Sequence, residues 1–126
     1  MKQKKIKLKH TMKSAHSEVS SEFVGFAIKE IDGHSITYFY TENDVRTFVC
    51  VEKQSVALMR IDDGMTAVWL NENKEGLLFK TSSMGELKLN LELEKLYISD
   101  EDVELSYHLI QDDQILDTIT LTWEEL

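Results

Sequence analysis

Arg60 is the residue whose chemistry would matter most inside a folded domain, because it ends the apolar run Val56-Ala57-Leu58-Met59. An arginine that points into an apolar interior is costly unless it has a partner. A bound carboxylate is a good partner, because the planar guanidinium can hold it through two hydrogen bonds. The candidate ligand-binding set adds three tyrosines and a tryptophan: Tyr38, Tyr40, Tyr107 and Trp69.

The alternation of side chains along this segment argues against an inward orientation of Arg60. Ala57, Met59 and Ile61 form its more purely apolar face. Successive side chains of a strand point to opposite faces, so this set would face inward and Arg60 would face solvent. The alternation therefore favours an exposed Arg60, whereas a role in ligand binding requires the inward orientation.

Other residues that commonly carry catalysis are scattered. The four histidines show neither His-x-His nor Glu-x-x-His spacing, which zinc sites often use. The single Cys50 lies among Phe48, Val49 and Val51, a setting typical of a buried, inert thiol. The sequence contains no Gly-x-Ser-x-Gly turn, and its five glycines never cluster into a phosphate-binding loop. We therefore expect a protein that is not an enzyme, with no cofactor and no metal.

Charge is distributed unevenly along the chain. Residues 1–16 carry six lysines and no acidic residue. That leaves eight of the 14 basic residues against all 23 acidic ones in the other 110, a net charge of −15. An acidic body repels nucleic acid, and the lysines are typical of the wet face of an edge strand. With no apolar segment of spanning length and a lone thiol, we expect a cytoplasmic protein without nucleic-acid or membrane partners.

The elements that must position these residues are strands. Leu87, Leu89, Leu91 and Leu93 alternate strictly with polar residues, so the four leucines should be buried together. The phase slips at Glu94-Lys95, which predicts a β-bulge. Similar runs recur along the whole chain, separated by short turns such as Asp32-Gly33.

About ten strands at this spacing predict one all-β domain over residues 1–126. Short turns can join only antiparallel neighbours. An up-and-down meander of 8–10 twisted strands should curl and close into a barrel, because closure removes the exposed edges. A two-sheet sandwich is the alternative.

Several segments carry a family resemblance. They are Ile36–Glu42, Val56–Arg60 followed by Gly64, Met84–Leu87 and Thr120–Glu124. In these the chain resembles the YwiB-like family of uncharacterised bacterial proteins, described as calycin-like β-barrels. The resemblance implies the architecture of lipocalins, which often bind apolar small molecules, and it implies no catalytic residue. Fold by itself does not establish function.

Two functions fit such a barrel. The first is non-catalytic binding of a small apolar or amphipathic ligand in the interior. The second is a homodimerising interaction module without a ligand, because the strands between residues 45 and 70 are apolar on both faces. A barrel has one interior, so one apolar face of each strand should point outward, and outward apolar patches mark interfaces. A cavity in the interior would favour the first function, and a filled interior the second.

Overall fold

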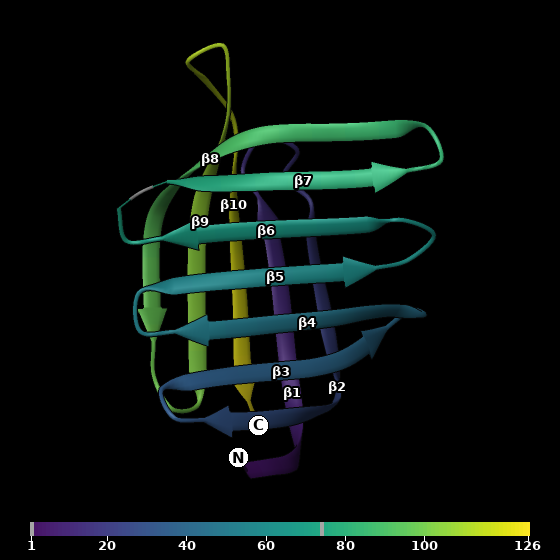
Figure 1. Ribbon diagram of the computed structural model, residues 1–126, viewed down its shortest axis with the longest axis vertical. Helices are drawn as coiled ribbons and strands as arrows, with labels where there is room; N and C mark the ends of the chain where they lie inside the picture. Colours follow the sequence, from purple (N-terminus) through teal and green to yellow (C-terminus); the bar gives the residue numbers. More distant parts are fainter. Residues whose placement is uncertain (1, 74) are drawn as a thin grey trace.

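The computed structural model describes residues 2–73 and 75–126, which form ten β-strands (Figure 1). In chain order the strands are β1 (Lys2–Ser14), β2 (Ser20–Asp32), β3 (Ser35–Glu42), β4 (Val45–Glu52), β5 (Ser55–Ile61), β6 (Met65–Asn71), β7 (Gly76–Ser82), β8 (Gly85–Ile98), β9 (Asp102–Gln111) and β10 (Gln114–Glu125). The described part of the chain has no helix of the length and apolarity that crossing a membrane requires.

The strands form one closed, antiparallel barrel. They follow chain order around it, and pairing of β1 with β10 closes the circle. The barrel is flattened into two crossing layers: β3 to β7 run across the front of Figure 1, while β1, β9 and β10 run behind them nearly at right angles. The predicted up-and-down barrel is therefore confirmed, and two separate sheets are excluded.

The leucines of β8 follow the predicted alternation only in part. Leu91 and Leu93 are buried in the core, and the polar residues between the leucines are exposed. The expectation that Leu87 and Leu89 join them is wrong, because Leu89 is half-buried and Leu87 is 47% exposed. Leu87 pairs with the exposed Lys80, near the start of β8. Solvent reaches the inner face of the barrel at this end.

The register between β4 and β5 decides which face of β5 is buried. Val56 and Leu58 are buried because they pair with buried valines of β4. Arg60 lies two residues beyond Leu58, so it is on the same inward face. The expected inward face of this strand was therefore wrong. Its three residues lie on the outer wall: Ala57, Met59 and Ile61.

The described strands contain two register shifts, of which one was predicted. The register of β8 against β9 shifts between Leu93 and Lys95, which confirms the predicted bulge. A second shift, in β10 between Ile115 and Asp117, had not been predicted. Gly25 produces no bulge against β1. The Phe23 ring lies over it instead, and a Cβ at residue 25 would be 2.5 Å from that ring.

The lysine-rich strand β1 is an edge over its first half only. It pairs with β2 over Lys2–Lys13 and with β10 over Leu8–Ser14. Several of its lysines do lie on the wet face, as predicted. Lys2–Lys7 pairs with β2 alone, so this stretch keeps one free edge, and its lysines fit the protection of that edge.

Candidate functional site

Side chains fill the middle of the barrel. Trp123, Tyr38, Leu8, Leu70 and Leu105 are almost completely buried there, together with four valines. Packing of this kind places the polar groups that solvent can reach at the open ends of the barrel. The two ends differ in their chemistry.

A row of polar side chains crosses one end on the inner face of the front layer. Thr47 of β4 is the register partner of Tyr40 in β3 and of Arg60 in β5. Arg60 also pairs with Thr66 of β6, which pairs with Lys80 of β7. Register partners lie side by side on one face of a sheet. We call this end, defined by these five residues, the Arg60 mouth.

Two groups in the Arg60 mouth lack partners. No carboxylate of the described residues lies within 4.0 Å of the Arg60 guanidinium. Thr47 is 2% exposed, and its hydroxyl has no hydrogen-bond partner among the described residues. A buried polar group without a partner costs about 1–3 kcal/mol, so a native structure that retains one requires an explanation.

Aromatic side chains lie behind this row. The Trp123 Nε1–H donates to the Tyr40 hydroxyl at 2.9 Å. His10 stacks on Trp123 with a centroid distance of 5.0 Å, and Phe23 stacks on Tyr40 at 5.3 Å. The His10 Nδ1–H donates to the Thr122 carbonyl at 2.9 Å. His10 is therefore a half-buried residue whose Nδ1 has a hydrogen-bond partner.

The charges of Glu42 and Arg60 both act on the titration of these aromatic groups. Burial lowers the pKa of His10; the Thr122 carbonyl and Glu42 oppose that shift, and the Arg60 charge adds to it. Burial raises the pKa of Tyr40 to about 12, and Arg60 acts against that rise. The guanidinium charge therefore acts on two interior groups, as an inward orientation requires.

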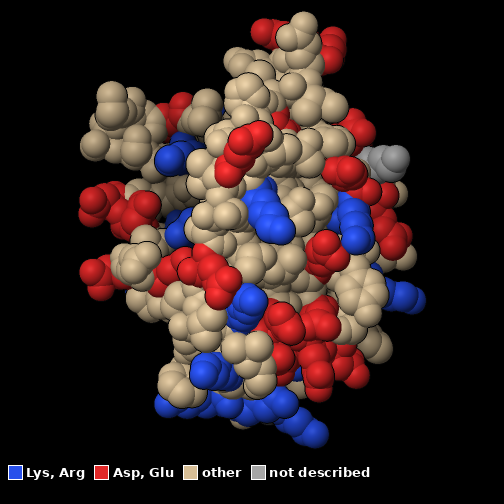
Figure 2. Space-filling view, turned by 180° about the vertical axis from the view of Figure 1, so that it is seen from behind, with Lys and Arg blue, Asp and Glu red and all other residues tan. Residues whose placement is uncertain are grey.

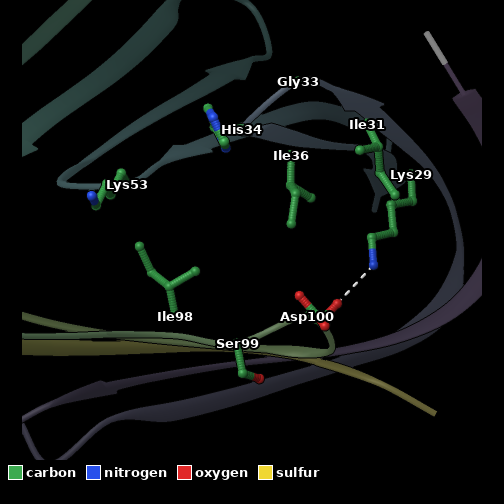
Figure 3. Close-up of a pocket in the computed structure, with 9 residues that line it drawn as sticks. All are labelled: Lys29, Ile31, Gly33, His34, Ile36, Lys53, Ile98, Ser99 and Asp100. Atoms are coloured by element: carbon green, nitrogen blue, oxygen red, sulfur yellow. Dashed lines mark hydrogen bonds between the residues drawn. The ribbon is translucent and has the colours of Figure 1, made fainter.

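The opposite end of the barrel holds an open pocket of about 710 Å³ (Figure 3). Ile31 and Ile36 from β2 and β3 face Ile98 from β8 across it. Lys29 and Lys53 line its sides. This pocket combines apolar walls with cations, so it is the second candidate site.

The buried cation of this pocket already has partners. The Lys29 Nζ donates to the Glu125 carboxylate at 2.6 Å and to the Asp100 carbonyl at 2.7 Å. The Tyr38 hydroxyl donates to the same Glu125 oxygen at 3.0 Å. Burial, and the charge of Glu125 after it, raise the pKa of the Tyr38 phenol. We call these four residues the Lys29 clasp.

A shallow apolar groove of about 450 Å³ lies on the outer wall of the front layer. Met59 and Trp69 flank it and are exposed. Cys50 lines it and is half-buried, with its thiol 3.4 Å from the Ser35 hydroxyl. The expectation of a fully buried thiol was therefore wrong. The groove is lined by Phe48, Cys50, Ala57, Leu58, Met59, Ile61, Ala67, Val68 and Trp69.

The structure brings together only part of the ligand-binding set predicted from the sequence. Tyr40 lies in the Arg60 mouth, and Tyr38 lies in the clasp at the opposite end. Tyr107 is buried in β9, where burial raises the pKa of its phenol to about 12. Trp69 is on the outer wall, away from the interior. Sequence reasoning missed Thr47, whose only signal was its alternation with Val49 and Val51.

Comparisons with known proteins agree with the geometry. The crystal structure of the ywiB protein from Bacillus subtilis is similar, with a TM-score of 0.69 and 19% sequence identity over 97% of this chain and 93% of that chain. At this identity the likeness shows the fold alone. No curated protein matches the chain. A family model, described as a domain of unknown function (DUF1934), matches residues 5–122. The resemblance seen in the sequence is confirmed, and the chain belongs to the DUF1934 family.

Proposed function

We propose that the barrel binds a small amphipathic anion at the Arg60 mouth, without catalysing a reaction on it. The observation that carries this proposal is that Arg60 and Thr47 are register partners and that neither the guanidinium nor the buried hydroxyl has a partner among the described residues. A carboxylate can take two hydrogen bonds from the guanidinium and one from the hydroxyl. Binding would thus satisfy both groups.

The other candidate locations support the proposal less well. In the pocket of Figure 3 the buried cation, Lys29, is already neutralised by Glu125. The middle of the barrel is filled by large side chains such as Trp123 and Tyr38. The ligand should therefore be short, with its anionic group at Arg60 and its apolar part toward Tyr40, the aromatic residue of the mouth.

The proposal predicts a binding preference that calorimetry can measure. Octanoate and benzoate should bind, whereas octanol and benzamide should bind more weakly because they lack the charge. Arg60→Gln should weaken octanoate binding about 10–100-fold, since hydrogen bonds to charged groups contribute about 1.5–3 kcal/mol. Equal affinity of the wild type and this variant for octanoate would contradict the proposal.

Thr47→Val provides a control for folding. It replaces the unpaired buried hydroxyl by a methyl group, so the free energy of unfolding should rise by about 1 kcal/mol while octanoate binding weakens. Thr120→Val is the matched control, in which the replaced hydroxyl has a hydrogen-bond partner. The Thr120 hydroxyl bonds the Ser106 hydroxyl at 2.9 Å, so this variant should lose stability and keep its affinity. Weaker octanoate binding in Thr120→Val, with binding in Thr47→Val unchanged, would place the ligand elsewhere.

A second candidate function, homodimerisation through strands 45–70, rests on the outer groove. The large side chains of Trp69 and Met59 stand next to the small Ala57 and Ala67. In a two-fold dimer, the large side chains of each subunit could pack over the small alanines of the other, so the same patch would serve both partners. The apolar lining supplies the driving force for covering this patch.

Dimerisation predicts a change in mass that sedimentation can measure. The wild type should be a dimer at about 50 µM, and Met59→Lys should be a monomer because it places an unpaired charge in the interface. Lys88→Gln, on the outer wall outside the groove, should remain a dimer. A monomeric wild type at this concentration would contradict the second function and leave the first untouched.

A further inference from the structure

Lysines and apolar side chains face each other across the outer wall of β1 and β2. In register, Lys5 pairs with Ile28, Lys7 with Phe26, and Lys9 with Val24. All six side chains point away from the interior, because the inward face of these strands carries buried residues such as Leu8 and Ala27. We call the six residues the β1–β2 face.

The apolar side chains of this face are unusually open for a strand. Phe26 is 64% exposed, Val24 46% and Ile28 40%. The Lys5 ammonium lies 4.5 Å from the centre of the Phe26 ring. Leu126, whose N–H donates to the Lys7 carbonyl at 2.9 Å, adds a further side chain that is 60% exposed. The face thus combines cations with apolar groups within one short stretch of wall.

Acidic residues lie at both ends of this face. Glu22 lies 3.9 Å from Lys9, and Glu124 is the β10 partner of the same lysine. Glu30 accepts a hydrogen bond from Gln3 at the other end. Between these ends Lys5 and Lys7 have no carboxylate within 4.0 Å among the described residues. Figure 2 shows basic side chains gathered at the lower end of the molecule, where Figure 1 places the N-terminus, and acidic ones above them.

We propose that the β1–β2 face docks on an anionic lipid surface. The row of Val24, Phe26 and Ile28 would enter the boundary between headgroups and acyl chains, as the apolar face of an interfacial element does. The lysines beside it would reach the lipid phosphates. The expectation of no membrane partner came from the lack of a spanning segment, and a surface contact needs none.

Two observations favour lipid over other anionic partners. A single-stranded nucleic acid would need aromatic platforms for its bases, but two of the three apolar side chains are aliphatic. A protein partner would need acidic groups placed opposite Lys5 and Lys7, whereas an anionic lipid surface presents phosphates at every position. This inference is independent of ligand binding at the Arg60 mouth, which lies on the inner face.

Vesicle co-sedimentation tests the docking. The wild type should bind vesicles of phosphatidylcholine with about 30% phosphatidylserine, and should not bind phosphatidylcholine alone. The double variant Lys5→Gln/Lys7→Gln should lower the partition coefficient on the order of 25-fold, because each lysine without a carboxylate partner contributes roughly a factor of five. Phe26→Ser should lower it about 10-fold through lost apolar contact.

A matched control comes from the other layer of the barrel. Lys88 lies over the Phe79 ring at 5.8 Å, which repeats the Lys5–Phe26 pair outside the β1–β2 face. Lys88→Gln should therefore leave vesicle binding unchanged. Binding that Phe26→Ser does not weaken, or equal binding to neutral vesicles, would overturn the proposal. Tighter binding to a 20-nucleotide single-stranded DNA than to vesicles would overturn it as well.

Discussion

Lys29→Met should lower the free energy of unfolding by about 3–5 kcal/mol, measured by urea denaturation at neutral pH. The Lys29 and Glu125 side chains are only 5% and 11% exposed, and their charged atoms lie 2.6 Å apart. Methionine matches the length of the lysine stem but removes the cation. The Glu125 carboxylate would then be buried with the Tyr38 hydroxyl as its remaining side-chain partner.

Two controls separate the buried charge from a general loss of packing. The double variant Lys29→Met/Glu125→Leu should recover most of the lost stability, because an apolar pair of similar volume can replace a buried ion pair. Lys95→Met is the exposed counterpart, since Lys95 and Glu104 form a 3.1 Å pair on the surface. It should cost less than about 1 kcal/mol. Similar losses in Lys29→Met and Lys95→Met would contradict the assignment of the clasp.

Alternation and turn residues were enough to predict the barrel, because both are local properties of the chain. Strict alternation in β8 also predicted the bulge after Leu93. Alternation could not predict which face of β5 points inward, because both faces of this strand are apolar. Pairing with the buried valines of β4 decides it, and that register depends on two strands together.

In the candidate site, too, the sequence predicted residues by their type but did not predict contacts between residues far apart in the chain. Arg60 and Tyr40 were found because their residue types suggest anion binding. Thr47 was missed because a threonine in a strand usually needs no explanation, and only burial shows that its hydroxyl lacks a partner. The Lys29–Glu125 pair was missed because 96 residues separate its members, and no sequence pattern links them before the barrel closes.

Trp123→Ala should lower the free energy of unfolding by about 3–5 kcal/mol, the range for truncating a fully buried tryptophan. Trp123 is 0% exposed. Its loss would remove the surface on which His10 stacks and leave the Tyr40 hydroxyl without its donor. Urea denaturation followed by far-ultraviolet circular dichroism measures this loss without depending on tryptophan fluorescence.

The second tryptophan of the chain is the matched control. Trp69 is 47% exposed on the outer wall, so Trp69→Ala should cost only about 1 kcal/mol in a monomer, in proportion to the area it buries. If the outer groove forms a dimer, this cost should grow between about 1 and 50 µM protein, because only the dimer buries Trp69 fully. The loss in Trp123→Ala should exceed that of Trp69→Ala at both concentrations. Equal losses at the lower concentration would mean that the inward and outward faces of β6 and β10 have been assigned incorrectly, and Tyr40 of the Arg60 mouth would lose its assigned hydrogen-bond donor.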